Sequence, residues 1–443
     1  MRRSLQRKSV LTYHGAKAPT TNKTTILNAQ IELNAALATP IILAGQKQKA
    51  YLRIGLTGHR LKNEKVAPLN VVLVIDKSSS MQGEKIRQAK EAALMVLERL
   101  RKNDIFSVVT YDHRGEILLP ATPAQEKDII KTTLNRMRAG GQTALYDGIE
   151  KGAKEIQKFL NRNRINRIIL ISDGQANVGP NSLDELGELA TSLGQENIVI
   201  TTIGLGLSYH EDLLTVLAKK SDGNHIFVEQ ASNLVHFFDF EFSDLFSVVA
   251  QEVTITLIGV NGVRIIRVLG REATIQGQEI SVKLNQLYSC YEKYVLVELE
   301  VPPCHATEKH VLAGVAVVYR KMNACTTDRV STIVTASFSE SPEKVEEKTN
   351  RIVMTAVAEQ LAVEKNKQAV KLRDEGEIKN AQQLLLNNVD FLSEEAAKYG
   401  SENLKKLKEI NLKDANHLDQ KSWVKQRKSM RRQQYKSETQ QNY

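Results

Sequence analysis

The feature that most constrains the fold is a regular alternation of two kinds of segment between residues 70 and 229. Five short runs are rich in Ile and Val, and the segments between them place apolar residues three and four positions apart. Nearly continuous apolar runs are typical of strands covered on both faces, and the longer spacing predicts amphipathic helices. Alternating strands and helices predict an α/β domain with a doubly wound, mostly parallel sheet. The predicted strands are residues 71–75, 104–111, 167–172, 198–205 and 225–229.

The periodicity changes after a last predicted helix over residues 232–251. Short strand-like runs separated by Gly, Pro, Asn and Gln turns continue to residue 338, which is the pattern of an antiparallel β-sandwich. Two further strand-like runs, 25–33 and 50–57, come before the α/β domain and are too few to fold alone. We therefore expect them to pair with the strands after residue 253, which makes the α/β domain an insertion in the sandwich.

The C-terminal part of the chain has a helical pattern with a break at Asp374-Glu375-Gly376, which predicts a helical hairpin. Beyond residue 398 the composition is rich in Lys, Asn and Gln, and we expect frayed helix followed by disorder. The predicted divisions are a basic disordered N-terminus (1–24), N-terminal sandwich strands (25–68), the α/β domain (69–251), the sandwich (252–342), a helical hairpin (343–398) and a basic, partly disordered tail (399–443).

The net charge of +10 comes almost entirely from the two ends of the chain. Residues 1–23 hold six Lys or Arg and no acid, and residues 421–443 hold seven with a single Glu, so the body is close to neutral. No apolar run is long enough to span a bilayer, and no secretory signal is recognised. The three cysteines, Cys290, Cys304 and Cys325, do not suggest a disulfide framework. These observations predict a soluble, cytoplasmic protein.

Hydroxyl and carboxylate side chains occur in three loops of the α/β domain. Two of these loops directly follow predicted strands, and the third follows Gly140-Gly141. Ligands of open parallel sheets gather at the carboxyl ends of the strands, where loops distant in sequence can meet. Hard oxygen donors suit Mg²⁺, Mn²⁺ or Ca²⁺ and argue against zinc or copper. The sequence therefore predicts a divalent-metal site formed by Asp76, Ser78, Ser80, Thr143 and Asp173.

The charge of such a site favours a further ligand. Two neighbouring carboxylates repel each other unless a cation lies between them. Neutral hydroxyls as direct ligands leave that cation short of negative charge, so it can accept a carboxylate from a partner protein. Taken singly, each of these residues is explained more simply by a helix cap or a turn. Their occurrence together in three loops favours a metal site.

At these residues the sequence resembles the von Willebrand factor type A domain and its metal-ion-dependent adhesion site. The shared pattern is Asp-x-Ser-x-Ser, a Thr after a Gly-rich turn, and Asp-Gly after an apolar strand, within about residues 70–251. One departure is Ser79, where many members have Gly. The resemblance implies a Rossmann-like doubly wound sheet and a metal that commonly completes its coordination with an acidic residue of a partner. It also implies that Ser78, Ser80 and Thr143 are direct ligands, and that Asp76 and Asp173 bind directly or through water.

The segments that flank this domain are similar to those of two groups of proteins. They are the bacterial Ca-activated chloride channel-like proteins and the inter-alpha-trypsin inhibitor heavy chains, in which a sandwich surrounds the type A domain. The resemblance implies the same arrangement in this chain.

The leading functional hypothesis is a non-enzymatic protein–protein interaction module that uses Mg²⁺, with Mn²⁺ or Ca²⁺ as possible replacements. An alternative is a Mg²⁺-dependent enzyme or enzyme subunit acting on a phosphate substrate, although no phosphate-binding loop or catalytic base is recognised. A third is an adaptor for nucleic acid or anionic membrane that binds through the basic ends, including residues 425–436. A zinc site is a further alternative, but its candidate ligands lack paired spacing: Cys290, Cys304, His305, His310 and Cys325.

Overall fold

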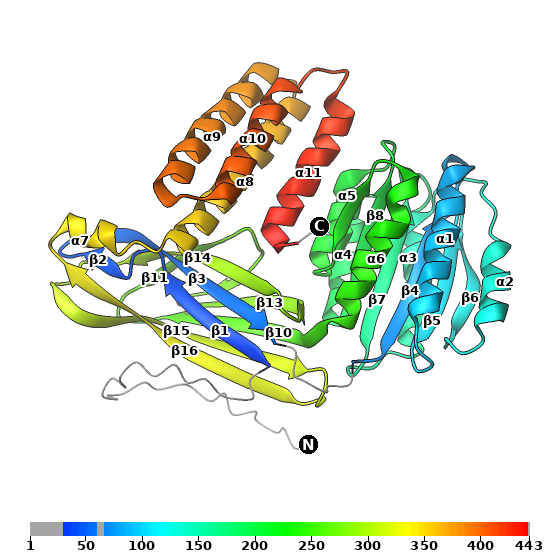
Figure 1. The fold of residues 1–443 in the computed structure, drawn as a ribbon, viewed down its shortest axis with the longest axis horizontal. Helices are drawn as coiled ribbons and strands as arrows, with labels where there is room; N and C mark the ends of the chain where they lie inside the picture. The colour runs from blue at the N-terminus through cyan, green and yellow to red at the C-terminus, as the bar shows by residue number, and fades with distance from the viewer. Residues whose placement is uncertain (1–29, 60–65, 442–443) are drawn as a thin grey trace, which may run out of the picture.

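The computed structural model describes residues 30–59 and 66–441, which form an α/β domain, a β-sandwich and a bundle of helices (Figure 1). The bundle lies above the junction between the other two bodies in this view. The predicted basic N-terminus (1–24) and the start of the predicted strand 25–33 lie outside the described residues. Among those that are described, no helix combines the length and the apolar character needed to cross a membrane.

The α/β domain contains a six-stranded sheet with the order β6-β5-β4-β7-β8-β9. All neighbouring strands pair in parallel except β5 and β6, which form an antiparallel hairpin. The doubly wound, mostly parallel sheet predicted from the sequence is therefore confirmed. Its strands are β4 (Leu69–Asp76), β5 (Ile105–Tyr111), β6 (Gly115–Pro123), β7 (Ile165–Ser172), β8 (Ile198–Leu205) and β9 (His225–Val228).

Helices cover both faces of this sheet, as its apolar strands require. In β4, Leu73 points into a core formed with the first, second and sixth helices, and Val74 points into a second core formed with the other three. Alternate residues of a strand face opposite sides, so both sets must be apolar. The helices are α1 (Glu84–Arg99), α2 (Lys127–Asn135), α3 (Leu145–Gln157), α4 (Leu183–Gln195), α5 (Glu211–Lys220) and α6 (Leu234–Phe246), with 3₁₀ turns η1 (Ser79–Met81) and η2 (Ala231–Asn233).

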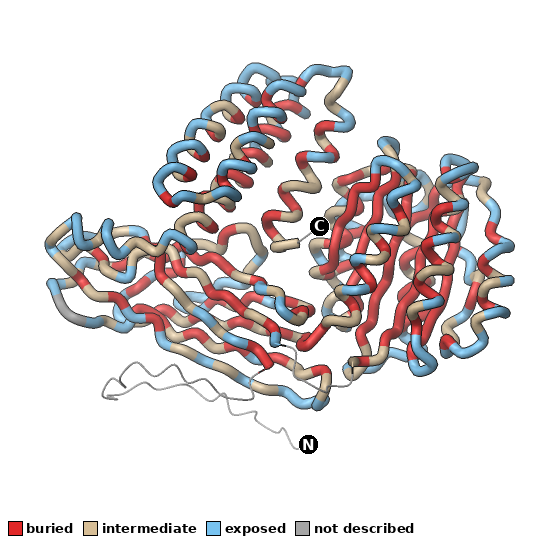
Figure 2. Tube along the Cα trace, viewed as in Figure 1, coloured by how far each residue is buried: buried red, intermediate tan, exposed pale blue. Residues whose placement is uncertain are grey.

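The sandwich consists of a four-stranded sheet, β1-β3-β14-β11, and a six-stranded sheet, β12-β13-β10-β15-β16-β2. Strand β3 pairs antiparallel with β14, with Ile54 opposite Val295, so the α/β domain is an insertion in the sandwich as predicted. Figure 2 shows the buried positions along the sandwich strands. The strands are β1 (Ile31–Leu37), β2 (Ile41–Leu43), β3 (Gln48–Gly58), β10 (Val248–Gly259), β11 (Arg264–Leu269), β12 (Thr274–Gln276), β13 (Glu279–Tyr288), β14 (Glu292–Val301), β15 (Thr307–Lys321) and β16 (Thr327–Ser339).

The C-terminal helices begin with the predicted hairpin, which turns at Gly376 with a positive φ of 87°. The predicted disorder of the tail is wrong, because two further helices follow residue 400 and the last of them packs between the bundle and the α/β domain (Figure 1). The helices are α7 (Pro342–Glu347), α8 (Arg351–Asp374), α9 (Ile378–Tyr399), α10 (Glu402–Asn416) and α11 (Trp423–Thr439).

Polar contacts hold helix α11 in place. The Arg427 guanidinium lies 2.7 Å from a carboxylate oxygen of Asp212 and 2.9 Å from one of Asp374, and it also pairs with Glu211. Near the other end of the helix, the Tyr435 hydroxyl donates a 2.6 Å hydrogen bond to the Gly223 carbonyl. A helix anchored by charges has few apolar residues, which is why composition alone predicted disorder.

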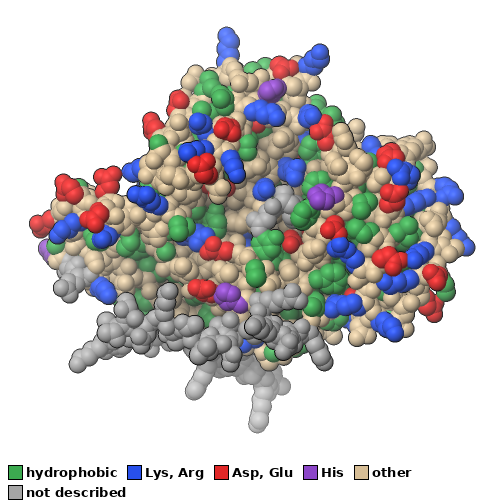
Figure 3. Space-filling model, in the orientation of Figure 1, with side chains coloured by type: hydrophobic (Ala, Val, Ile, Leu, Met, Phe, Trp, Pro, Cys, Tyr) green, Lys and Arg blue, Asp and Glu red, His purple; other side chains and the backbone are tan. Residues whose placement is uncertain are grey.

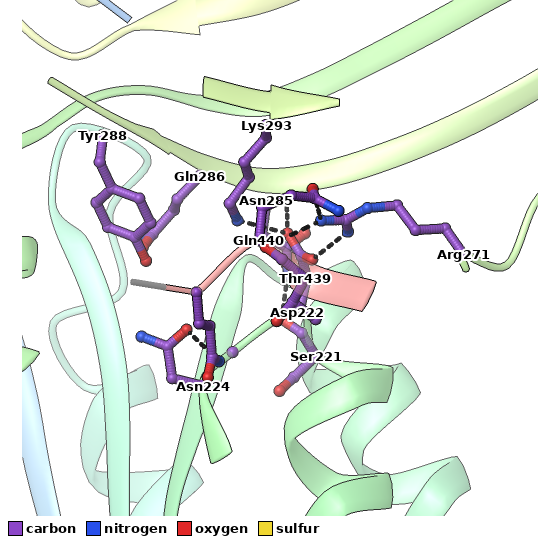
Figure 4. Close-up of polar contacts among 12 residues, drawn as sticks. Ser221, Asp222, Asn224, Arg271, Asn285, Gln286, Tyr288, Lys293, Thr439 and Gln440 are labelled. Carbon is purple, nitrogen blue, oxygen red and sulfur yellow. Dashed lines mark hydrogen bonds and ion pairs between the residues drawn. The ribbon is translucent and has the colours of Figure 1, made fainter. Parts of the chain in front are cut away.

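The three bodies meet at the partly buried side chain of Asp222 (Figure 4). Asp222 accepts a 2.7 Å hydrogen bond from the Asn285 backbone N–H of β13 and pairs with Arg271 at 3.1 Å. Burial alone would raise the pKa of Asp222, but Lys293 and Arg271 hold it below its ordinary value. Arg271 also donates to Gln440, just beyond α11, so one cluster connects the α/β domain, the sandwich and the C-terminal end.

Replacing Arg427, the cation of α11 that pairs with three carboxylates, tests how this helix is held in place. Arg427→Ala removes the partner shared by three carboxylates, so we expect a loss of about 2–4 kcal/mol in the free energy of docking of this helix. Hydrogen exchange should then be faster in residues 423–439. The control is Lys425→Ala, whose ion pair with Glu229 is largely exposed and contributes about 1 kcal/mol or less. Equal protection of α11 in Arg427→Ala and wild type would contradict this account.

Candidate metal centre

The three predicted loops lie at the same edge of the α/β sheet. Strands β4 and β7 are neighbours, with Ile75 opposite Ile171, so Asp76 at the end of β4 and Asp173 just after β7 are brought close together. Thr143 lies just before the first residue of α3. The parallel register of two adjacent strands therefore places the two carboxylates at one edge.

The oxygens of the five predicted residues converge. The Ser78 and Ser80 hydroxyls lie 3.0 Å apart, and the Ser80 hydroxyl donates a 2.7 Å hydrogen bond to Asp173 Oδ1. The Ser78 backbone N–H donates to Asp76 Oδ1 at 2.8 Å, which turns the chain after β4. The structure thus brings two of the three loops into direct hydrogen-bonded contact.

Gly174 shows where the third loop lies. A Cβ atom placed on Gly174 would be 3.2 Å from Thr143 Oγ1, 3.5 Å from Ser80 Oγ and 3.8 Å from Asp76 Oδ2. The position of this Cβ is therefore within 4 Å of an oxygen of Asp76, of Ser80 and of Thr143. Gly174 has no side chain to fill the position between these oxygens, and hard oxygens around such a position fit a divalent cation.

Backbone contacts fix the loops relative to one another. The Ser79 backbone N–H and the Ser79 hydroxyl each lie 3.1 Å from the Gly141 carbonyl oxygen. Ser79 was noted as a departure from the pattern of related domains, and here its side chain joins the first loop to the second. Gly141 has a φ of 97°, and a Cβ there would be 2.9 Å from the Cβ of Asp112. A glycine is therefore needed at position 141.

Three residues of the site were not identified from the sequence. The Asn177 side-chain oxygen accepts a 2.9 Å hydrogen bond from the Thr143 backbone N–H. The Ser172 hydroxyl donates to Asp76 Oδ2 at 3.0 Å, and the Lys85 ammonium pairs with Asp173 Oδ2. Asn177 and Lys85 lie outside the pattern, and only the adjacency of Ser172 to Asp173 could have suggested a role.

The two carboxylates are completely buried and unevenly neutralised. Asp76 and Asp173 are both 0% exposed. Burial raises the pKa of Asp76 to about 6, and the charge of Asp173 contributes to the rise, while hydrogen bonds from Ser78 and Ser172 offset part of it. Among the described residues, the Lys85 ammonium pairs with Asp173 and not with Asp76. With both carboxylates ionised, these three side chains have a net charge of −1, which also fits a cation.

The alternative ligand set for zinc does not gather in space. Within residues 30–59 and 66–441, no group of three or more His, Cys, Asp or Glu side chains is placed to hold a metal ion. The cysteines at 290, 304 and 325 are each free thiols.

Comparison with known proteins places the α/β domain in a family. Residues 70–240 match the von Willebrand factor type A domain. The chain is 30% identical over 210 residues to the uncharacterized protein sll0103 of Synechocystis, covering 47% of this chain and 49% of that protein. It is 25% identical over 209 residues to the uncharacterized protein YfbK of Escherichia coli, covering 47% of this chain and 36% of that protein.

A third relative is mouse inter-alpha-trypsin inhibitor heavy chain H2, which is 30% identical over 165 residues, covering 35% of this chain and 17% of that protein. The chain therefore spans about half, or less, of the length of the curated relatives it matches. These similarities concern the type A region rather than the whole of each relative.

Solved structures show that the complete three-body architecture recurs. A von Willebrand factor type A protein from Catenulispora acidiphila superposes with a TM-score of 0.70 at 16% identity, covering 89% of this chain and 92% of that one. The ArnB paralog VWA2 from Sulfolobus acidocaldarius superposes with a TM-score of 0.63 at 18% identity, covering 93% and 98%. At these identities the likeness concerns the fold alone.

Domains of the type A family are typically adhesion or protein-interaction modules and often bind divalent metal ions. The chain carries a von Willebrand factor type A domain, and over this domain it is related to YfbK, sll0103 and the inter-alpha-trypsin inhibitor heavy chains.

Proposed function

We propose that this chain is a divalent-metal-dependent protein-interaction module that binds an Asp or Glu side chain of a partner protein. The observation that carries the proposal is the convergence of three loops at one point: oxygens of Asp76, Ser80 and Thr143 surround the position of Gly174 in the third loop, and the Ser80 hydroxyl is hydrogen-bonded to Asp173. A bound Mg²⁺, or Mn²⁺ or Ca²⁺ in its place, would supply an electrophilic coordination position for the partner's carboxylate. The residues proposed to hold it are Asp76, Ser78, Ser80, Thr143 and Asp173.

Burial separates Ser80 from the other four residues. Asp76 and Asp173 are 0% exposed, Ser78 is 2% exposed and Thr143 is 4% exposed, so the two carboxylates balance charge from below. Ser80 is exposed, as are the neighbouring Gln142 and Gln175. The side of the site next to Ser80 is therefore the side open to a partner.

We propose that the protein binds its partner without catalysing a reaction. On the grounds of its sequence, we also propose that the protein lies in the cytoplasm. The C-terminal tail gives the adaptor hypothesis less support than its composition suggested, because four of the basic side chains in residues 425–436 form ion pairs with acids of the α/β domain. They are Lys425, Arg427, Lys428 and Arg431. On the face shown in Figure 3, basic and acidic side chains are interspersed.

Removing one proposed ligand tests the site directly. Thr143→Val keeps the shape of the side chain but removes Oγ1, so we expect Mn²⁺ affinity to fall by about 10- to 100-fold in calorimetric titration. Thr215→Val is the matched control, because the Thr215 hydroxyl on α5 has no hydrogen-bond partner within the described part of the chain. Wild-type protein that binds no Mn²⁺, or a Thr143→Val protein that binds it equally well, would count against the proposal.

The burial of Asp76 predicts a pH effect without any metal. Its pKa in the folded protein, about 6, is above the ordinary value of 3.8. The folded state therefore holds the proton more tightly, and this group's contribution to stability falls as the pH rises from about 4 to about 6. Asp76→Asn removes the penalty, so in chelator the variant should gain up to about 3 kcal/mol over wild type above this range.

The measurement is urea unfolding of both proteins in chelator, near pH 4 and near pH 7.5. Comparing the two proteins at each pH cancels the other titrating groups. A stability difference that is the same at both pH values would show that Asp76 is not held in the environment described.

A further inference from the structure

The Lys85 ammonium lies directly against the proposed metal ligands. Lys85 is the second residue of α1, and its ammonium pairs with Asp173 Oδ2, while the other oxygen of Asp173 accepts the hydrogen bond from Ser80. The Asp173 side chain is completely buried, and that of Lys85 is 29% exposed. The Lys85 ammonium, with its single positive charge, therefore shares the Asp173 carboxylate with the proposed divalent cation.

The position of this ammonium is restricted from a second side. A Cβ atom placed on Gly206 would lie 3.7 Å from both Cε and Nζ of Lys85. Gly206 follows strand β8, has a positive φ of 69°, and donates its backbone N–H to the Val228 carbonyl at 2.8 Å. The end of the Lys85 side chain thus lies between Asp173 and a loop that is itself hydrogen-bonded to the sheet.

This placement changes the charge balance of the site. Two ionised carboxylates alone would neutralise a divalent cation, but with Lys85 their combined charge is −1, and a bound divalent cation would bring it to +1. The Lys85 ammonium and a divalent cation that share the Asp173 carboxylate would repel each other appreciably in this partly buried site. Lys85 should therefore weaken the binding of the metal and strengthen the binding of an additional anion once the metal is present.

We infer that Lys85 lowers the affinity of the site for the divalent metal and raises the affinity of the metal-loaded site for the carboxylate of a partner. Lys85 is a fixed positive charge beside Asp173, so it repels the metal cation and attracts the carboxylate. The effect that metal and carboxylate have on each other's binding is reciprocal and comes from their own contact, with or without Lys85. The inference rests on the proposed function and adds to it a residue that sets the balance between metal binding and partner binding.

A structural role for Lys85 alone predicts the opposite result. If the ion pair served only to hold η1 and α1 in place, its loss would loosen the ligands and weaken metal binding. Lys77, in the loop between β4 and α1, offers a matched control, because it is also a partly buried lysine but pairs with Asp112 and Glu116, at 3.1 Å and 3.0 Å.

The test is calorimetric titration of the full chain with Mn²⁺. Lys85→Met and Lys85→Gln should each bind Mn²⁺ about tenfold more tightly than wild type or better. Lys85→Arg and Lys77→Met should stay within about threefold of wild type. The Gln variant retains a hydrogen-bond donor toward Asp173, so it reports on charge even if Lys85→Met folds poorly.

A second titration series measures carboxylate binding to the protein saturated with Mn²⁺, with acetate as the probe replacing chloride at constant ionic strength. Acetate should bind Mn²⁺-loaded wild type more tightly than Mn²⁺-loaded Lys85→Gln. Mn²⁺ binding that is unchanged or weakened in both neutral variants would overturn the role of Lys85 and leave the proposed function standing. Absence of Mn²⁺ binding in wild type and every variant would overturn the proposed function as well.

Discussion

The charge of two buried carboxylates is the constraint on which the rest of the site depends. Asp76 and Asp173 are at the ends of adjacent parallel strands, where the backbone register leaves them no route to solvent. Ionised groups in such a place need hydrogen bonds or a cation. The structure supplies the Ser78 N–H and the Ser172 hydroxyl to Asp76, and the Ser80 hydroxyl and the Lys85 ammonium to Asp173. These groups leave one negative charge over, which the proposed divalent cation would convert into one positive charge that a partner's carboxylate can balance.

The surrounding architecture holds the strand that precedes Asp173. Arg167 of β7 forms a fully buried ion pair with Glu241 of α6, at 3.2 Å, and donates to Gln286 of β13 at 2.5 Å. Helix α6 ends at Phe246 and β10 begins at Val248, so the domain passes into the sandwich with almost no linker. The site is therefore built on a sheet that is joined to its neighbours by buried polar contacts, and preorganised ligands of this kind require little rearrangement on binding.

Periodicity predicted those parts of the fold in which apolar burial decides the structure. Strand β4 is apolar on both faces because helices cover both, and the N-terminal strands could be assigned to the sandwich because they had no other partners. Strand β6 was missed, since Gly115–Pro123 lies at the sheet edge and is largely exposed, with Ile117 44% exposed. Helix α11 was missed for a different reason: its anchors are the charges of Arg427 and Lys428 and the hydroxyl of Tyr435, which do not form an apolar stripe.

The five candidate ligands could be named from spacing because hydroxyls and acids at strand ends are unusual in combination. Lys85 and Asn177 could not, since a lysine in the first turn of a helix and an asparagine in a loop are ordinary in sequence, and only the geometry gives them a role. The central claim is tested most directly by a crystal grown with Mn²⁺ and measured with X-rays above the manganese absorption edge. The account predicts an anomalous peak among the oxygens of Ser78, Ser80 and Thr143. A peak elsewhere, or none at this edge of the sheet, would contradict it.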